Sequence, residues 1–198
     1  NNKNYESILV DDASTDNTVN VIKNIKKDNI KILENKLNKG QSYSIREGIK
    51  HSSNNIIVTL DGDGQNDPND ITNLLNIYIN NHDIKLVGGI RSKRQDNIIK
   101  IISSKLANYF RSRILNDGCK DTGCSLKVFN KNIFLEFPYF DGIHRFLPAL
   151  FKGFGHNTFF VDVNHRKRKF GVSKYGTINR FFRGIIDLVK VNKIIKNR

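Results

Sequence analysis

The sequence predicts an α/β fold in which a mostly parallel β-sheet is flanked by helices. Short apolar runs rich in β-branched residues alternate with amphipathic stretches, and this alternation is typical of parallel strands joined by helical crossovers. The chain of 198 residues is long enough to bury one core, and no internal repeat or proline-rich linker divides it. Acidic motifs directly follow two of the apolar runs, at the strand ends where parallel sheets bind ligands.

The expected elements follow from the period of the apolar residues, which is two in strands and near 3.6 in helices. In the first half we expect strands at Tyr5–Val10, Lys31–Glu34, Asn55–Leu60 and Lys85–Ile90, with helices at Thr18–Lys27, Gln41–His51 and Pro68–Asn80. In the second half we expect a helix at Ile98–Leu115, a strand at Cys124–Phe129, a helix near Arg145–Phe151, a strand at Thr158–Val163, a basic loop at His165–Gly176 and a final helix from Ile178.

The composition narrows the classes of partner and the cell compartment. A formal net charge of +14 attracts polyanions such as nucleic acid, anionic lipid headgroups or phosphorylated substrates, without choosing among them. Cys119 and Cys124 have no second pair and no histidine arranged around them, so we expect reduced cytosolic thiols rather than a zinc site or a disulfide. No run reaches the roughly 18 apolar residues of a spanning helix, and no signal segment opens the chain, so we expect a soluble or peripheral protein.

The segment Asp61-Gly62-Asp63-Gly64-Gln65 follows the apolar run that ends at Leu60. Two carboxylates separated by one glycine can converge on a divalent cation when the chain turns tightly between them, and Gln65 adds a third oxygen. Hard oxygen ligands suit Mg²⁺ or Mn²⁺, and such a cation neutralises a diphosphate leaving group. The motif therefore predicts a metal site formed by Asp61, Asp63 and Gln65.

Three other interpretations of this segment compete with a metal site. An acidic surface turn needs nothing beyond the Asp-Gly-Asp residues themselves, and short motifs are frequently fortuitous. A calcium-binding EF-hand loop beginning at Asp61 would require glycine and glutamate where the chain has Asn66 and Thr72, so it is excluded. A haloacid-type phosphatase would also place Asp-x-Asp-Gly after a strand but would continue with threonine, whereas Gln65 stands here, and it remains a weak rival.

A second acidic motif, residues Val10 to Thr18, ends the first expected strand. Ser14 or Asp16 can cap the helix that follows by accepting hydrogen bonds from its unpaired amides. Capping does not require the adjacent acids Asp11 and Asp12, whose mutual repulsion needs a compensating partner such as a base edge, a ribose or a metal. The pair is therefore a candidate nucleotide site on the same rim of the sheet as the metal motif.

These motifs occur in the order and spacing of the family-2 inverting glycosyltransferases, which the chain resembles from Tyr5 to about Asp187. The resemblance implies a GT-A-type, Rossmann-like sheet and a sugar donor linked to a nucleotide diphosphate. More narrowly, it points to the dolichol-phosphate mannosyltransferase-like branch, which glycosylates polyprenyl (dolichyl or undecaprenyl) phosphates with inversion at the anomeric carbon. The segments that carry it are Val10–Thr18, Asn38–Gly40 and Leu60–Gln65 for the family, and Asp121–Lys127, His144–Pro148 and Gly171–Gly176 for the branch.

The resemblance also implies roles for single residues. In so basic a chain a lone Arg or Lys is usually a solvated surface charge, and that interpretation stays open for the cations among them. The implied nucleotide-sugar residues are Asp11, Asp12, Asn38 and Gly40, with Arg168, Ser173 and Lys174 on a basic loop that folds over the donor diphosphate. The implied acceptor-phosphate residues are Arg91 and Lys127. The implied catalytic residues are Asp61 and Asp63, with Asp141 where other family-2 enzymes keep a base.

The resemblance further implies that a first strand is absent from this sequence. Family members normally begin with a strand and a nucleotide-binding turn well before the Val-Asp-Asp motif, whereas this sequence starts only shortly before it. Loss of a central parallel strand would leave its neighbours unpaired and part of the nucleotide pocket unbuilt. An inactive or assisting relative of such an enzyme therefore remains an alternative.

Transfer to the implied phosphate acceptor has little need of a general base. A lipid phosphate is already anionic at neutral pH, so its attack on the anomeric carbon needs positioning and charge screening. Asp141 is then less important for proton transfer than it would be with a saccharide acceptor in cell-envelope polysaccharide synthesis, which is the second alternative. A nucleic-acid binder would interleave basic residues with stacking aromatics on one face, and here the basic residues are spread through phosphate-handling loops, so we expect no nucleic-acid partner.

The distribution of apolar and charged residues in the last helix is relevant to a lipid acceptor. One face is apolar and the opposite face is charged, which is typical of a helix lying at a membrane interface and also of a helix packed on a core. The basic tail from Lys190 to Arg198 favours an anionic membrane surface. We therefore expect a catalytic domain at residues 1–176, a basic juxtamembrane helix at residues 177–198, and a peripheral position on the cytoplasmic face of the membrane. The apolar face comprises Phe181, Phe182, Ile185, Ile186 and Val189, and the charged face Arg180, Arg183, Asp187 and Lys190.

Overall fold

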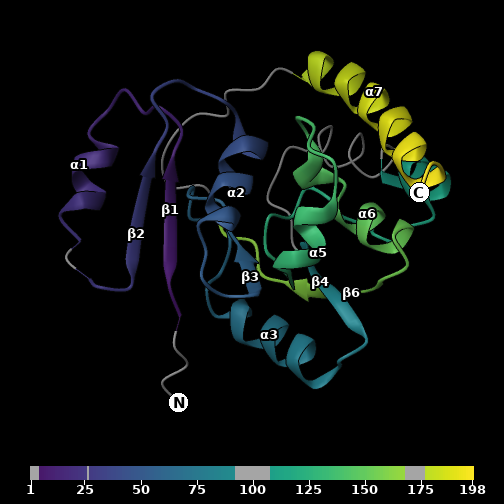
Figure 1. Ribbon diagram of the computed structural model, residues 1–198, viewed down its shortest axis with the longest axis horizontal. Helices are drawn as coiled ribbons and strands as arrows, with labels where there is room; N and C mark the ends of the chain where they lie inside the picture. The colour runs from purple at the N-terminus through teal and green to yellow at the C-terminus, as the bar shows by residue number, and fades with distance from the viewer. Residues whose placement is uncertain (1–4, 26, 92–107, 168–176) are drawn as a thin grey trace.

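The computed structural model has two parts of β-sheet side by side, with helices on both faces (Figure 1). It describes residues 5–25, 27–91, 108–167 and 177–198, the last range with side chains from residue 183. The strands are β1 (Ser7–Asp11), β2 (Ile30–Glu34), β3 (Ile56–Thr59), β4 (Ile84–Arg91), β5 (Lys127–Asn130) and β6 (Asn157–Val163). The helices are α1 (Thr18–Lys23), α2 (Gln41–Lys50), α3 (Asp70–Asn80), α5 (Lys131–Glu136), the 3-10 turn η1 (Ile143–Arg145), α6 (Leu147–Gly153) and α7 (Thr177–Lys196), and residues 108–115 are also helical.

The sheet is mostly parallel, as the sequence predicts. β1 pairs with β2 in parallel, and the second part has the order β3-β5-β4-β6. β4 and β6 are parallel, whereas β5 is antiparallel to both of its neighbours, so β3, β4 and β6 run in one direction and β5 in the other. The expected strands are all present with small shifts at their ends. The expected helix at Ile98–Leu115 lies partly outside the described residues, and the short α5 was not expected.

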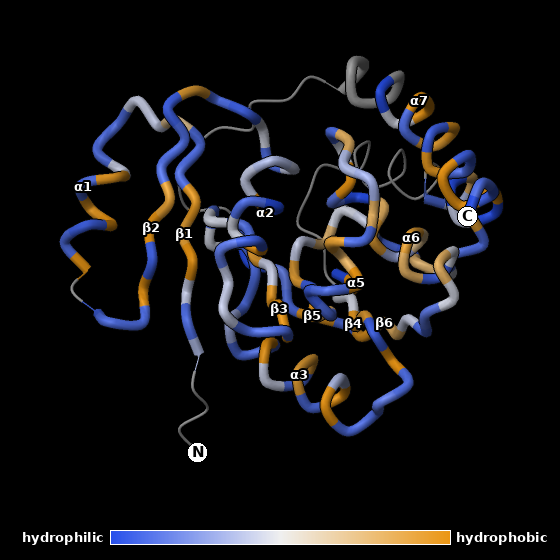
Figure 2. The backbone as a smooth tube through the Cα atoms, viewed as in Figure 1, coloured by the Kyte–Doolittle hydropathy of each residue, from blue (hydrophilic) through white to orange (hydrophobic). Residues whose placement is uncertain are grey.

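Alternating side chains of the central strands fill a core on each face of the sheet. In β4, Leu86 joins the larger core beneath α5, α6 and α7, while its neighbour Val87 joins the core beneath α3. In β5, Phe129 lies in the larger core and its neighbour Val128 in the core beneath α3, because successive side chains of a strand point to opposite faces of the sheet. Hydrophobic colouring in Figure 2 lies along the strands and on the helices that cover them, such as α3 and α6.

Helix α2 connects the two parts of the sheet. Within the described part of the chain, β1 is hydrogen-bonded only to β2, and β3 only to β5. α2 packs closely on β1 because Gly48 has no side chain: a Cβ there would lie 3.1 Å from Val10 Cγ2. On its other side α2 inserts Ile49 into the larger core. One helix thereby fixes β1 relative to β3.

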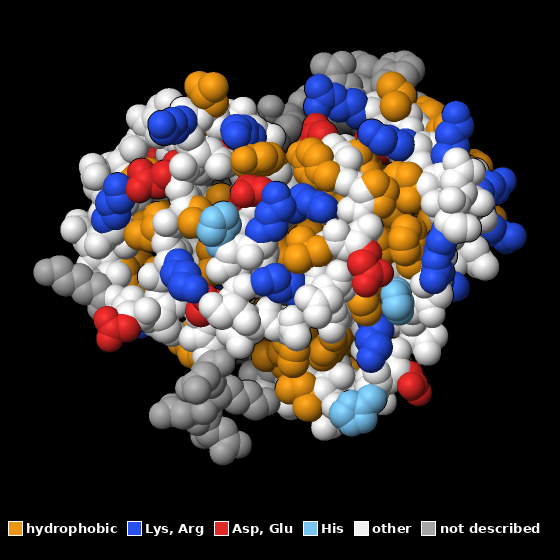
Figure 3. Space-filling model, viewed as in Figure 1, with side chains coloured by type: hydrophobic (Ala, Val, Ile, Leu, Met, Phe, Trp, Pro, Cys, Tyr) orange, Lys and Arg blue, Asp and Glu red, His pale blue; other side chains and the backbone are white. Residues whose placement is uncertain are grey.

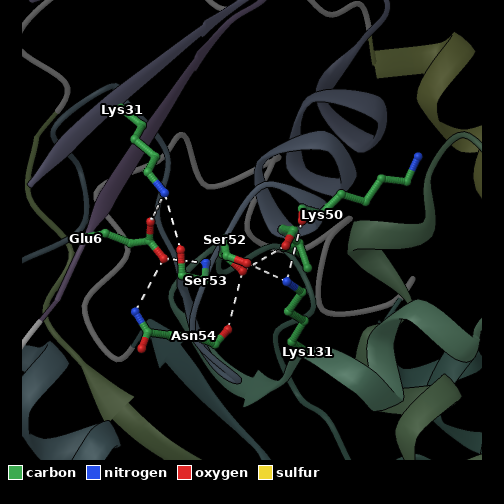
Figure 4. A network of polar contacts seen from close by, with 8 residues as sticks. Glu6, Lys31, Lys50, Ser52, Ser53, Asn54 and Lys131 are labelled. Atoms are coloured by element: carbon green, nitrogen blue, oxygen red, sulfur yellow. Dashed lines mark hydrogen bonds and ion pairs between the residues drawn. The ribbon is translucent and has the colours of Figure 1, made fainter.

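A polar network ties the same parts together at the end of the strands where β1 begins (Figure 4). Glu6, which precedes β1, accepts a hydrogen bond from Lys31 Nζ in β2 at 2.7 Å. It also accepts hydrogen bonds from the backbone amide of Ser53 and from Asn54 Nδ2, both in the turn before β3. The hydrogen bond from Lys31 is the main reason that the pKa of Glu6 lies below its ordinary value.

Helix α7 packs against α6 and is apolar on two sides. Val191 is fully buried in the larger core, and Gly153 of α6 lets Ile195 approach so closely that a Cβ on the glycine would lie 2.6 Å away. On another side of the same helix, Ile186 and Val189 are 66% and 52% exposed, and both belong to the apolar face that was expected at a membrane. Among the described residues, no helix is long and apolar enough to span a membrane. The expected boundary at residue 176 falls outside the described part of the chain.

Replacing Glu6 with Gln should lower the free energy of unfolding by about 1 kcal/mol at neutral pH, because a charge-assisted hydrogen bond is lost while the side-chain shape is kept. Since the pKa of Glu6 is lowered by folding, its contribution is complete above the ordinary glutamate pKa of 4.5 and is lost as the pH falls through the folded pKa. Urea unfolding at neutral pH and well below pH 4.5 should therefore separate the two proteins only at neutral pH. Glu47→Gln, which removes an ion pair within α2, is the control, and an equal loss in both variants would contradict the bridging role of Glu6.

Candidate active site

The predicted site residues gather at one rim of the sheet. β3 leads directly to Asp61 at its carboxyl end, and the antiparallel β5 begins at the same place, since Lys127 pairs with Thr59. β4 ends there with Arg91, and the amino end of α2 reaches both Asp61 and the turn after β1. The rim therefore joins residues from both parts of the sheet.

Asp61 is the partly buried acid at the centre of this rim. Gln41 Nε2, at the first position of α2, donates a hydrogen bond to Asp61 Oδ1 at 2.7 Å, and the Ser125 hydroxyl, which donates to Asn66 Oδ1 at 2.7 Å, lies nearby. Burial raises the pKa of Asp61 above its ordinary value, and the charge of Asp63 adds to the rise, whereas Ser125 and nearby cations oppose it. The carboxylate thus lies where a positive charge would be stabilised.

The two predicted acceptor-phosphate cations both lie close enough to Asp61 to lower its pKa, but their partners differ. Lys127 is 4% exposed, and its Nζ donates to the carbonyl oxygen of Cys124. Arg91 forms a two-pronged ion pair with Asp121, with Nε to Oδ2 at 2.7 Å and Nη2 to Oδ1 at 2.8 Å. The absence of a side chain at Gly123 permits this pair, because a Cβ there would lie 2.8 Å from Arg91 Nη2.

The rest of the metal motif is held by its own turn and by the end of β6. Gly64 adopts a φ of 72°, and Asp63 Oδ1 accepts the backbone amide of Gln65 at 3.0 Å. The side chain of Gln65 lies against His165, with 3.2 Å between Gln65 Nε2 and His165 Nε2. The Gln65 carbonyl accepts the amide of Arg166 at 2.8 Å, so the segment after β6 is fastened to the motif.

The residues of this turn fit a hard divalent cation. The charge of Asp63 helps to raise the pKa of Asp61, and a repulsion of this kind between carboxylates is relieved by a cation. Within the described ranges no three His, Cys, Asp or Glu side chains form a metal cluster, so a cation would take its remaining ligands from Gln65, from water or from a substrate. Oxygen ligands of this kind favour Mg²⁺ or Mn²⁺ over softer metals.

The acids of the second motif have protein partners. Asp11 is buried and accepts hydrogen bonds from the backbone amide and the hydroxyl of Ser14. Asp12 accepts the backbone amides of Lys39 and Gly40, each at 2.8 Å. Burial alone would raise the pKa of Asp12, but these amides bring it below its ordinary value. The repulsion between the two acids is therefore compensated within the chain, and Asp12 fixes the loop that precedes α2.

This loop also places Gly40 and Asn38 beside the rim. Asn38 Nδ2 donates to the carbonyl oxygen of Asp12 at 3.3 Å, and Gly40 has a φ of 87°, which favours glycine. A Cβ on Gly40 would lie 3.9 Å from Asp141 Oδ1, so Asp141 stands beside the start of α2. Its side chain is 67% exposed and lies 3.8 Å from Arg183 of α7. The predicted residues Arg168, Ser173 and Lys174 lie outside the described residues.

A cavity of about 120 Å³ opens next to Asp61, between the start of α2, the loop before β5 and η1. His144 of η1 is held by Ser42, with 2.7 Å between His144 Nδ1 and Ser42 Oγ. A larger hollow of about 440 Å³ lies between α6 and α7 and contacts none of the predicted site residues. The polar residues that line the smaller cavity include Gln41, Asp61, Ser125, Lys127, His144 and Arg145.

Sequence reasoning missed three residues that contact the metal motif. Gln41 was placed in a helix but not in the site, although the first residue of a helix that follows the Gly40 turn faces the same rim. Ser125 lies two residues ahead of Lys127, whose role was predicted. His165 follows β6, and the rule that parallel sheets bind ligands at the carboxyl ends of their strands would have included it.

Comparisons with known proteins agree with these motifs. Dodecaprenyl-phosphate galacturonate synthase of Rhizobium johnstonii is 38% identical over 193 residues, which cover 94% of this chain and 56% of the relative. Undecaprenyl-phosphate 4-deoxy-4-formamido-L-arabinose transferase of Shewanella sediminis is 34% identical over 181 residues, which cover 89% of this chain and 54% of the relative. The chain therefore spans about half the length of these relatives.

Solved structures share the fold at low sequence identity. Glucosyl-3-phosphoglycerate synthase of Mycobacterium tuberculosis, in complex with Mn²⁺, UDP-glucose and phosphoglyceric acid, superposes with a TM-score of 0.68 at 16% identity, covering 94% of this chain and 68% of that one. Mannosyl-3-phosphoglycerate synthase of Rubrobacter xylanophilus gives 0.68 at 14% identity, covering 93% and 62%. The fold is of the GT-A type, as the sequence predicts.

The family model described as glycosyl transferase family 2 matches residues 1–137, which include both acidic motifs and the loop before α2. Asp61, the Asp12 loop and the cation Lys127 stand on one rim of a GT-A-type sheet, as the resemblance in the sequence implies. The chain belongs to glycosyl transferase family 2.

Proposed function

We propose that this chain forms the catalytic domain of an enzyme that transfers a sugar from a nucleotide diphosphate to a polyprenyl phosphate, with inversion at the anomeric carbon. The observation that carries the proposal is the rim at which the partly buried Asp61 and the nearby Asp63 lie beside the buried cation Lys127. A diphosphate donor with its metal needs the acids, and a phosphate acceptor needs the cation. The names of two relatives, which include dodecaprenyl phosphate and undecaprenyl phosphate, support this acceptor class.

The donor is placed on the β1 side of the rim. Asp12 holds the loop that contains Asn38 and Gly40, and we propose that this loop and Asp11 receive the base and ribose of a UDP- or GDP-linked sugar. A solved neighbour of the same fold binds UDP-glucose with Mn²⁺, which supports a UDP donor. We propose further that Arg168, Ser173 and Lys174 bind the donor diphosphate.

Asp61, Asp63 and Gln65 would hold Mg²⁺ or Mn²⁺, which would neutralise the diphosphate as it leaves. In the transfer itself, an anionic oxygen of the acceptor phosphate attacks the anomeric carbon. The bond from that carbon to the donor diphosphate breaks, and the nucleoside diphosphate departs with the electron pair. No proton is moved, and Lys127 screens the repulsion between the two phosphate-bearing substrates.

A saccharide acceptor is the second candidate, and the exposure of Asp141 favours it. A hydroxyl group must lose its proton during the attack, and Asp141 is an exposed carboxylate beside the Gly40 loop that could accept it. The two acceptors therefore differ in their need for Asp141. With a phosphate acceptor, the carboxylate is dispensable for proton transfer.

We propose that α7 rests on an anionic membrane surface, with the enzyme on the cytoplasmic face. Ile185, Ile186 and Val189 are exposed on the side of α7 away from the core, and Lys and Arg side chains border this end of the molecule (Figure 3). Exposed apolar residues next to cations are typical of helices that lie in a lipid interface. The acceptor lipid would then reach the rim from the side of α7.

The donor site is tested with Asp63→Ala and isothermal titration calorimetry. We expect the wild-type chain to bind UDP- or GDP-linked sugars only when Mn²⁺ or Mg²⁺ is present, and Asp63→Ala to lose this metal-dependent binding, because one of two metal carboxylates is gone. Asp83→Ala, an exposed acid in the turn before β4, should bind as the wild type does. Wild-type affinity in Asp63→Ala would contradict the metal assignment, and no binding of any donor to the wild type would contradict the proposed donor class.

The membrane surface is tested by co-sedimentation with vesicles of phosphatidylglycerol and phosphatidylcholine. Ile186→Asp should weaken binding by roughly tenfold or more, because it removes a large apolar side chain from the interface and adds a negative charge near anionic lipid. Ile79→Asp, at an exposed apolar position of α3, is the matched control. Equal binding of both variants would show that α7 is not the contact surface.

A further inference from the structure

We propose that Arg145 binds the phosphate of the acceptor, at the wall of the cavity nearest α7. The inference rests on the proposed function and replaces the role that the resemblance gave to Arg91. Arg145 lies in η1 and lines the cavity that also contains Asp61 and Lys127. A phosphate held between Arg145 and Lys127 would therefore face the acids that hold the donor.

Arg91 is poorly suited to this role because its guanidinium is already matched to a carboxylate. Both prongs of the fork contact Asp121, and the backbone amide of Arg91 donates to the same carboxylate at 3.2 Å. The side chains of the pair are only 14% and 6% exposed. If Arg91 bound a phosphate, its ion pair with Asp121 would break. The buried Asp121 carboxylate would then have no opposite charge beside it, which is strongly unfavourable. The pair instead holds the loop before β5, which forms part of the cavity wall.

Arg145 has donors to spare. Its Nη2 contacts Asp187 Oδ2 of α7 at 2.7 Å, and its Nε is buried without a hydrogen-bond partner among the residues that the structure describes. Arginine carries five N–H donors in a planar fork that matches phosphate oxygens, and a buried donor without a partner is unfavourable. The Arg145 side chain as a whole is 32% exposed and lines the cavity, so a phosphate there has access to the guanidinium. The guanidinium is thus prepared for a phosphate in a way that Arg91 is not.

The position of Arg145 also selects the acceptor over the donor. Asp187, its ion-pair partner, belongs to the helix whose exposed face bears Ile186 and Val189. The ion pair passes over Gly142, where a Cβ would lie 2.6 Å from Asp187 Oδ2 and 2.9 Å from Arg145 Nη2. A lipid that arrives along α7 would bring its phosphate to this side of the cavity.

The test measures binding of farnesyl phosphate, farnesol, and UDP with Mn²⁺ to the full chain by isothermal titration calorimetry. In Arg145→Gln, the affinity for farnesyl phosphate should fall by about 10- to 100-fold, the range expected for losing a charged hydrogen-bond donor. The affinities for farnesol and for UDP with Mn²⁺ should not change. Arg113→Gln, which removes an exposed arginine far from the cavity lining, should bind all three ligands as the wild type does.

A second variant separates binding from a purely structural role of the ion pair. Arg145→Lys keeps a cation opposite Asp187 but lacks the planar fork, so it should retain wild-type thermal stability and still bind farnesyl phosphate more weakly. Wild-type affinity for farnesyl phosphate in both variants would overturn the inference and leave the proposed function standing. A parallel loss of farnesol binding, or a loss of UDP binding in place of farnesyl phosphate, would also overturn it. Failure of the wild type itself to bind farnesyl phosphate would refute the proposed acceptor together with the inference.

Discussion

The partial burial of the Asp61 carboxylate at the edge of the sheet constrains the residues around it. A charged group removed from water must find hydrogen bonds or opposite charge, and the raised pKa of Asp61 shows that burial is only partly offset. Gln41 comes to it from α2, Ser125 from the loop before β5, and Lys127 from β5 itself. Because these groups are distant in sequence, the site exists only when both parts of the sheet are held together, which is the task of α2 and of the Glu6 network.

The sequence located the strands but not the direction of β5, and the direction matters for the site. The alternation of apolar residues is the same whichever way a strand runs, so pairing and direction are decided by tertiary packing. In the observed order, the antiparallel β5 places Lys127 opposite Thr59, next to Asp61. A parallel β5 would have put the same residue at the far edge. The short α5 also escaped notice, although the Asn130 side chain, which accepts the amide of Ile133 at 3.1 Å, is a recognisable cap.

The acids of the site were visible in the sequence because carboxylates at strand ends are rare and conspicuous, whereas their partners were not. Asp12 was expected to need a ligand to compensate its charge, yet the amides of Lys39 and Gly40 supply the compensation. Backbone amides carry no signal in the sequence, since every residue except proline has one. His165 was missed for a related reason: it approaches Gln65 only because β6 pairs in parallel with β4.

The ion pair between Arg145 and Asp187 is not needed to fasten α7 to the protein. Val191 and Ile195 already pack that helix onto α6 and the larger core, and apolar contacts of this kind stabilise at least as well as a partly buried ion pair. Burial raises the pKa of Asp187 despite the opposing charge of Arg145, so the pair carries a cost of desolvation. An interaction that adds little to docking and still keeps an arginine at the cavity wall is better explained by what the arginine binds. The ion pair thus joins the helix that we propose to contact the lipid to the arginine that we propose to bind its phosphate.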